Sequence, residues 1–440
     1  MTTAPTHAGF PQAPNLIGPS RPLVVQTRMG FHDIPSMRRG LTAVRDSGTT
    51  AVGTITLDSF TRTNQHDRAR RALERGESLN GYPIVAHGAE RTRELLDGVV
   101  SAGFPVQMRH GSAKPFDIFR VMLDSGVTAT EGGPVSYCLP YSRVPLEEAT
   151  AEWSRSCDLL ASHDGDHPVH LETFGGCLLG QLCPPELLVA LSVLEARFFT
   201  DHGLRSVSLS YAQQTHAGQD AEALMALRTL ASRYLPADTA WHVVLYTYMG
   251  VYPHTPQGAL RLLADSAVLA TATGCERLIV KTVAESVRIP TVAENIQALR
   301  HAASAAAGPP TTLTPDDSGL LERTQRLIDA VLDLEPTTGR ALVTAFKRGV
   351  LDVPYCLHPD NMNRARANID RTGRLIWTAT GRMPLGPLPA RNADHQVTAA
   401  GLLGLLAHVQ RSYDTPAEPP RATPRAPAHK PLETARHAHV

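Results

Sequence analysis

The sequence has no close cysteine pair, no long apolar run and no excess of charge of either sign. Its 440 residues hold 42 Lys and Arg against 42 Asp and Glu, so nothing electrostatic favours nucleic acid or an anionic membrane as partner. The six cysteines form no CxxC pair, which excludes zinc ribbons and CxxxCxxC clusters. No apolar run reaches the roughly 18–20 residues of a membrane span, and segment 1–20 lacks the basic and apolar regions of a signal peptide. We therefore expect a cytoplasmic globular protein with reduced thiols.

Lysine is also scarce. Only four of the 42 basic residues are lysines, at positions Lys114, Lys281, Lys347 and Lys430. A single arginine is therefore weak evidence for a site in this chain, whereas a lysine in a special place is less readily explained as background.

Short β-branched runs alternate with amphipathic segments over most of the chain. The predicted strands are 23–28, 51–57, 104–109, 127–131, 169–173, 206–211, 242–248 and 277–282. The predicted helices are 34–47, 90–102, 115–125, 146–161, 185–202, 219–235, 255–273 and 291–306. Eight strands, each followed by a helix, are what an α/β protein of the (β/α)8 TIM-barrel type requires. An open doubly wound sheet is the alternative, but it would more often show a Gly-rich phosphate turn, and no GxGxxG or Walker motif is present.

The barrel pattern stops near residue 307, which suggests a division of the chain. We expect an N-terminal extension at 1–21, a catalytic barrel at 22–307, a turn-rich linker at 308–319, a small C-terminal α+β domain at 320–414 and a disordered tail at 415–440. In the smaller domain the pattern predicts helices at 320–334 and 338–347 and a strand at 374–379.

Unusual polar residues fall where predicted strands end. In a TIM barrel these ends form the face that carries reactive groups. The residues are Arg28, Arg62, Arg109, His110, Glu131, Tyr137, Tyr141, Lys281 and Glu285.

Three arginines at one barrel mouth would repel each other, and burying them unpaired costs several kcal/mol each. The cluster is tolerable if the counter-charges arrive with the ligand, and Arg holds a carboxylate by paired hydrogen bonds. The pattern therefore predicts a small ligand with more than one carboxylate. Glu131 would offer an anion to an ammonium group, which together suggests an acidic amino acid.

Structural roles remain open for each of these residues. Any one arginine can form a surface or structural salt bridge, and Glu131 can serve a helix N-terminus. Tyr137 and Tyr141 can be packed rings, and His110 can be a hydrogen-bonded neighbour of the site. Lys281 and Glu285 can form an ordinary ion pair at a helix start.

Two segments have a superficial likeness to metal sites. The spacing of Cys177 and Cys183 fits no common site, so buried thiols are favoured there. The segment from His163 to His167 reads as a polar turn. We predict no metal site.

The linked motifs resemble the large (epsilon) chain of methylaspartate mutase, also called glutamate mutase. They are Arg109-His110-Gly111, Glu131-Gly132-Gly133, Ser136-Tyr137, Pro140-Tyr141, Tyr248-Met249-Gly250-Val251-Tyr252-Pro253, Leu278-Ile279-Val280-Lys281-Thr282 and Ile289-Pro290-Thr291. The likeness runs in order over about residues 22–385. It implies an isomerase that interconverts L-glutamate and (2S,3S)-3-methylaspartate by an adenosylcobalamin radical mechanism.

The resemblance also implies roles for individual residues. Arg28, Arg62 and Arg109 would grip the two carboxylates, Glu131 would pair with the ammonium group and exchange its proton, and His110, Tyr137 and Tyr141 would complete the substrate shell. The positions similar to cobalamin or adenosyl contacts are Gly30, Asn80, Pro140, Tyr252, Lys281, Glu285 and Ile289.

The family holds cobalt through a His in an Asp-x-His-x-x-Gly motif, and none of the 19 histidines here has an Asp two positions before it. The resemblance therefore implies a separate small cobalamin-binding subunit that carries this motif, in a heterotetramer of two large and two small chains. Two rival functions remain open. One is a barrel lyase or aldolase for an acidic amino acid with Lys281 as Schiff-base lysine. The other is a non-catalytic paralogue that binds a dicarboxylate.

Overall fold

The computed structural model describes residues 22–163, 165, 167–178, 182–386 and 398–415. The expected N-terminal extension and all of the expected tail except Thr415 lie outside the described residues, as do parts of the 163–167 and 177–183 segments. The proposed domain boundaries stay a prediction.

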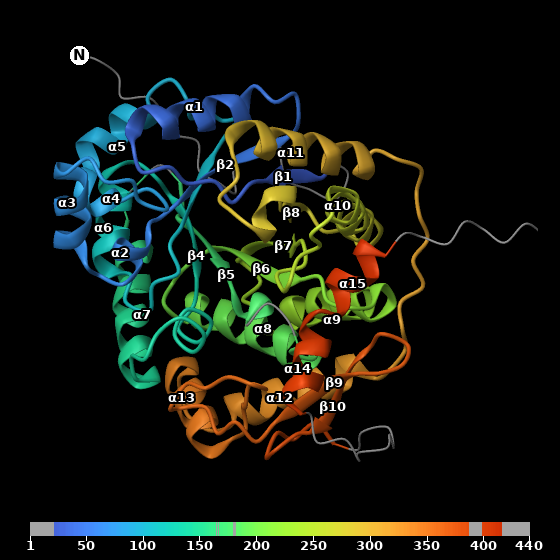
Figure 1. The fold of residues 1–440 in the computed structure, drawn as a ribbon. Coiled ribbons are helices and arrows are strands. Elements are labelled where there is room, and N and C mark those ends of the chain that lie inside the picture. Colours follow the sequence, from blue (N-terminus) through green and yellow to red (C-terminus); the bar gives the residue numbers. More distant parts are fainter. Residues whose placement is uncertain (1–21, 164, 166, 179–181, 387–397, 416–440) are drawn as a thin grey trace, which may run out of the picture.

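Eight parallel strands form a closed barrel, which confirms the predicted fold class (Figure 1). The strands are β1 (Val24–Gln26), β2 (Ala51–Thr56), β3 (Val106–Arg109), β4 (Ala129–Gly132), β5 (His170–Thr173), β6 (Ser206–Ala212), β7 (Ala240–Tyr246) and β8 (Arg277–Ile279). Each strand pairs with the next along the chain, and β8 pairs with β1 to close the ring. All eight carboxyl ends therefore open on one face.

A ring of helices surrounds the barrel. The main ones are α1 (Ile34–Arg45), α5 (Ala89–Leu96), α6 (Phe116–Asp124), α7 (Leu146–Ala161), α8 (Pro185–Asp201), α9 (Ala217–Tyr234), α10 (Pro256–Ala272) and α11 (Val292–Ala306). Local chemistry sets several of their starts: Asp33 caps α1, Thr255 caps α10 and Thr291 caps α11 through side-chain oxygens. Pro185 occupies the first position of α8, where a missing N–H costs nothing.

The segment between β2 and β3 differs from the prediction. It holds three short helices that the pattern did not indicate, α2 (Ser59–Arg62), α3 (His66–Glu74) and α4 (Ile84–His87). The helix predicted at 90–102 ends at Leu96, and Gly98 just beyond it has φ of 68°. That left-handed conformation ends the helix early. Two 3-10 turns follow β5 and β8, η2 (Gly175–Cys177) and η3 (Val283–Ser286).

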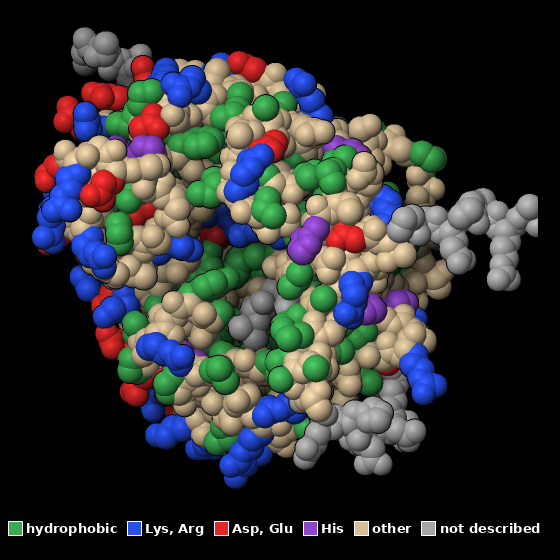
Figure 2. Space-filling view, in the orientation of Figure 1, with side chains coloured by type: hydrophobic (Ala, Val, Ile, Leu, Met, Phe, Trp, Pro, Cys, Tyr) green, Lys and Arg blue, Asp and Glu red, His purple; other side chains and the backbone are tan. Residues whose placement is uncertain are grey.

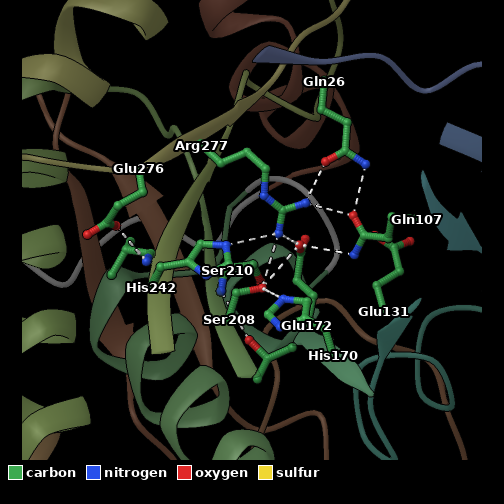
Figure 3. Close-up of polar contacts among 12 residues, drawn as sticks. Gln26, Gln107, Glu131, His170, Glu172, Ser208, Ser210, His242, Glu276 and Arg277 are labelled. Carbon is green, nitrogen blue, oxygen red and sulfur yellow. Dashed lines mark hydrogen bonds and ion pairs between the residues drawn. The ribbon is translucent and has the colours of Figure 1, made fainter. Parts of the chain in front are cut away.

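Polar side chains occupy much of the barrel interior, where such barrels more often hold Val, Ile and Leu. Figure 3 shows Arg277 of β8 among Gln26, Gln107 and Glu172. Arg277 and Glu172 are both fully buried. Several strands are therefore tied together across the barrel axis by hydrogen bonds rather than by apolar packing.

The C-terminal part packs against one side of the barrel (Figure 1). It comprises α12 (Leu320–Leu332), α13 (Thr338–Arg348), the antiparallel strands β9 (Arg366–Ile369) and β10 (Leu375–Ala379), α14 (Ala399–Leu406) and α15 (His408–Asp414). Leu327, Ile328 and Phe346 belong to the same buried cluster as the barrel helices. The predicted helices and strand of this part are present. Helices α14 and α15 and strand β9 were not indicated by the pattern.

No helix in the described ranges combines the length and apolar character needed to cross a bilayer. Among the same residues, no group of three or more His, Cys, Asp or Glu is arranged to hold a metal ion.

Candidate active site

A cavity of about 520 Å³ opens at the carboxyl ends of the strands. Figure 2 shows this face of the molecule, hollowed over the barrel. Most of the predicted site residues line the cavity: Arg28, Gly30, Arg62, Asn80, Arg109, His110, Glu131, Tyr137, Tyr141, Glu285 and Ile289. Pro140, Tyr252 and Lys281 are not among its lining residues.

An ion pair between Arg109 and Glu131 forms the floor of the cavity. Nε of Arg109 lies 2.7 Å from Oε2 of Glu131, and both side chains are buried. Glu131 also accepts hydrogen bonds from the hydroxyls of Tyr137 and Tyr246. Burial opposes the ionisation of Glu131, but Arg109 and these hydrogen bonds outweigh it, so its pKa lies below the usual value. The pair is therefore ionised and neutral overall.

The turn after β4 aims Tyr137 at Glu131. Gly132 has φ of 134°, and a Cβ there would lie 2.5 Å from Trp153 and 2.6 Å from the Tyr137 ring. Glycine is required at this position because both the backbone conformation and the close approach exclude a side chain. The Glu131-Gly132-Gly133 motif thus lets the tyrosine ring pack directly on the chain beside the glutamate.

Glu195 of α8 holds the same turn in place by hydrogen bonds. Its carboxylate accepts the backbone N–H groups of Val135 and Ser136 at 3.2 and 2.9 Å, the Ser136 hydroxyl at 2.9 Å and the Phe174 N–H at 3.3 Å. It is fully buried, and burial raises its pKa to about 7. The loops after β4 and β5 are therefore held by one side chain from outside the barrel.

His110 is buried at the edge of the cavity as a neutral ring. Its Nδ1 accepts the Ser112 N–H at 3.0 Å, so in the neutral ring the proton resides on Nε2. Burial lowers the pKa of His110 to about 4, which keeps the ring neutral. The ring also has a backbone hydrogen-bond interaction with Glu131, which acts against the effect of burial on the pKa. His110 therefore connects the ends of β3 and β4.

The second arginine, Arg28, meets Glu285 rather than standing free. Its NH1 lies 3.2 Å from Oε2 of Glu285, and the two side chains are 34% and 14% exposed. Glu285 also accepts the Thr282 N–H at 3.1 Å, so it serves the start of η3. The position of Glu285 therefore fits both a cofactor contact and a structural role at the start of η3.

Lys281 is buried beside the cavity, with Nζ 4.3 Å from the centre of the Tyr252 ring. Burial lowers its pKa to about 8, although Glu285 acts in the opposite direction. A lysine held over an aromatic face in this way gains a cation–π contact. No Lys281–Glu285 ion pair is formed within bonding distance in the part of the chain that the structure describes, because Glu285 turns to Arg28.

The outer part of the cavity is more open. Arg62 is half-buried and has no ion-pair partner within the described ranges. Asn80 accepts the Ser59 N–H at 2.9 Å and so holds the start of α2. Tyr141, Val287 and Ile289 are 47%, 78% and 56% exposed. The mouth therefore has an apolar rim.

Three residues of this region were missed by the sequence analysis: Tyr246, Glu172 and Glu195. Tyr246 ends β7, but the predicted strand ran two residues further, so the strand-end criterion pointed past it. Glu195 did leave a signal, since it is a lone acid within the apolar run of α8. Glu172 lies inside β5 and resembles any other strand residue.

The cavity offers the kinds of surface that a cobalamin group requires. The corrin of a cobalamin is broad and largely apolar, and an adenosyl ribose needs polar partners. The exposed apolar side chains at the mouth and the polar pair Arg28–Glu285 beside them supply both kinds of surface. The residues present fit such a group.

Fold and cavity together define a (β/α)8-barrel protein with a polar, arginine-lined ligand site at the carboxyl ends of its strands. The family model of the methylaspartate mutase E chain (MutE) matches residues 11–401, and the chain belongs to this family. It is 30% identical over 350 residues to the glutamate mutase epsilon subunit of Escherichia coli O157:H7, covering 75% of this chain and 72% of that one. It is 31% identical over 350 residues to the glutamate mutase epsilon subunit of Yersinia enterocolitica, with the same coverage.

Proposed function

We propose that this chain is the large subunit of an adenosylcobalamin-dependent mutase that interconverts L-glutamate and (2S,3S)-3-methylaspartate. The observation that carries the proposal is the buried Arg109–Glu131 pair, which faces the cavity beside Arg28 and Arg62. Family membership supports the reaction class, and the cavity supports an acidic amino acid as substrate.

In the proposed substrate complex the internal ion pair is exchanged for two new ones. The α-carboxylate or side-chain carboxylate takes the place of Glu131 on Arg109, and the ammonium group binds Glu131. Total charge is conserved, so the zwitterionic part of the substrate enters without leaving an unpaired buried charge. The second carboxylate is held by Arg62 and Arg28, which line the same cavity.

Adenosylcobalamin, when bound, supplies the radical chemistry of the rearrangement. Of the residues proposed to hold it, Gly30, Asn80, Glu285 and Ile289 line the cavity, and Pro140, Tyr252 and Lys281 lie outside its lining. This chain's own residues bind and orient the substrate, exclude water and hold the ammonium proton at Glu131. The cobalt ligand would come from a small subunit with Asp-x-His-x-x-Gly, in a two-large, two-small heterotetramer.

A direct test is the binding of substrate analogues to the complex with the small subunit. L-glutamate should bind more tightly than glutarate, which lacks the ammonium group, and more tightly than norvaline, which lacks the side-chain carboxylate. Equal binding of all three would contradict the proposed exchange of ion pairs.

A Schiff-base aldolase is the second candidate, and the lowered pKa of Lys281 favours it. Against it, the amine packs on the Tyr252 ring and the residue does not line the cavity. Borohydride reduction in the presence of a small oxo-acid separates the two. A covalent adduct at Lys281 would support the aldolase, and its absence is expected for the mutase.

A further inference from the structure

Tyr246 stands between two buried carboxylates. Its hydroxyl lies 2.8 Å from Oε2 of Glu131 and also donates to Oε1 of Glu172. All three residues are at most 1% exposed. A phenol has one proton, so at any moment it can donate fully to only one of these oxygens.

Each carboxylate has its own arginine. Arg109 pairs with Glu131 at 2.7 Å, and Arg277 pairs with Glu172. Burial, with Glu131 and Glu172 adding to it, raises the pKa of Tyr246 well above its ordinary value, so the tyrosine keeps its proton. The result is two neutral ion pairs joined by one shared donor.

The Glu172 side of this arrangement is rigid. Oε2 of Glu172 accepts from Nε2 of Gln107 at 3.2 Å and from the Ser208 hydroxyl at 3.3 Å. Arg277 is fixed in turn by Gln107 at 2.7 Å and by Gln26 (Figure 3). Glu172 therefore offers a fixed acceptor, whereas the other face of Glu131 opens to the cavity.

The Tyr246 ring is also fixed. It packs against Phe174 with centroids 5.6 Å apart, and the Arg109 guanidinium lies 5.2 Å from its centre. Only the hydroxyl proton is left free to rotate between its two acceptors.

We propose that Tyr246 is a positioning residue with two alternative acceptors. Without a ligand its hydroxyl is shared between Glu131 and Glu172, and its proton turns fully to Glu172 when an ammonium group binds Glu131. This inference rests on the proposed function for the identity of the incoming group. This arrangement keeps the buried Glu131 oriented in the absence of ligand. It also frees a lone pair of Glu131 for the ammonium group when the ligand binds.

The test is infrared difference spectroscopy at neutral pH. The Glu131 carboxylate band is identified by its loss in Glu131→Gln. In Tyr246→Phe, which keeps the ring and removes one oxygen, this band should shift because Glu131 loses a donor. Tyr211→Phe is the matched control, since Tyr211 is a buried tyrosine that donates to Asp220 at 2.8 Å away from Glu131. It should leave the band unchanged.

The change of acceptor of the Tyr246 proton is tested by adding ligands to the complex with the small subunit. L-glutamate should shift the phenolic C–O band that is lost in Tyr246→Phe, and glutarate should not. If Tyr246→Phe does not fold, Ser208→Ala replaces it. This variant removes one donor from Glu172 and keeps its pairing with Arg277, so Glu172 competes more strongly for the phenol and the Glu131 band should shift in the direction of weaker hydrogen bonding.

Each outcome decides a separate point. An unchanged Glu131 band in the folded variant would overturn the positioning role. If L-glutamate binds and the phenolic band does not shift, the proposed change of acceptor from Glu131 to Glu172 is wrong, but the positioning role of Tyr246 is not affected. If the wild-type complex does not bind L-glutamate, both the proposed function and the change of acceptor are refuted. The Glu131 band in Tyr246→Phe still decides separately whether Tyr246 positions Glu131.

Discussion

At the scale of single residues, the site contains counter-charges of its own. The sequence predicts three unpaired arginines that await a ligand, but Arg109 is paired with Glu131 and Arg28 with Glu285. A ligand must therefore compete with these internal pairs. Arg62 is the exception within the described residues, and in the proposed function its positive charge is available to a second carboxylate.

Arg109→Lys tests the carboxylate grip. Lysine keeps the charge but loses the planar fork, at a cost of about 1.5–3 kcal/mol per charge-assisted hydrogen bond lost. We expect kcat/KM for L-glutamate to fall by tenfold or more in steady-state assays with the small subunit. Arg120→Lys, at an exposed i,i+3 pair with Asp117, is the control and should behave like wild type. Wild-type turnover by Arg109→Lys would refute the grip.

Glu131→Gln tests the ion pair through stability. Removing one partner of a buried pair costs about 3–5 kcal/mol, because Arg109 is left without a counter-charge. We expect a lowered melting temperature in scanning calorimetry, and we expect glutarate to restore more of it than in wild type by placing a carboxylate on Arg109. Glu148→Gln, in an exposed pair with Lys114, should change little. An unaltered melting temperature would show that Arg109 does not depend on Glu131.

The residues that sequence reasoning found and missed differ in a physical way. Arg28, Arg109 and Glu131 could be predicted because the carboxyl ends of barrel strands share one face. Tyr246 and Glu172 could not, because an inward-facing polar residue within a strand is indistinguishable from an outward-facing one until the strand register is known. Their function depends on contacts between residues 115 and 74 positions apart.

At the scale of elements, α8 links the barrel wall to the site. It is almost wholly buried, between the strands on one side and α12 and α13 of the C-terminal part on the other. Glu195 is the point at which this helix contacts the loops after β4 and β5. The C-terminal part therefore supports the site through α8 without lining it.

Glu195 should give the stability a pH dependence. Its pKa is about 7 in the folded chain against an ordinary value of 4.5, because burial disfavours the charge. A raised folded pKa means that its stabilisation is complete below about 4.5 and is lost as pH rises through about 7, by an amount on the order of 3 kcal/mol. Urea unfolding across this range should show a smaller decline for Glu195→Gln than for wild type. Parallel curves would exclude Glu195 as the titrating group.

The helices show where local pattern suffices. Helix α1, which Asp33 caps, and helix α6 are each followed within three residues by a glycine with positive φ, Gly48 and Gly126, and both lie close to their predicted bounds. Helices α2 to α4 are short, and one of them, α2, is held by Asp58 and by Asn80 from 21 residues away, a tertiary contact that periodicity does not reveal. Likewise α15 is held at its end by Asp414, which accepts hydrogen bonds from His254 and Thr255 at 3.0 and 2.9 Å.

At the scale of the whole molecule, the cavity is incomplete as an enclosed site. Its floor is buried and polar, but Tyr141, Val287 and Ile289 stand exposed at its mouth. Radical chemistry requires exclusion of water, and an exposed apolar rim is stabilised when it is covered. In the proposed function, the cobalamin carried by the small subunit is that cover.

This arrangement predicts that the purified chain has no cobalamin absorbance and no mutase activity with added cofactor. Adding the small subunit should restore both, with a cob(II)alamin signal in electron paramagnetic resonance only when L-glutamate is present. Val287→Asp is the informative variant, because it places a charge on a side chain that is 78% exposed and touches none of the Arg109–Glu131 floor. It should weaken assembly with the small subunit, raising the concentration needed for half-maximal activity, while leaving kcat at saturation near wild type. Exposed Met225→Asp on α9 is the matched control and should not alter assembly. Full activity of the isolated chain with cofactor alone would end the two-subunit proposal, since the cover would then be unnecessary.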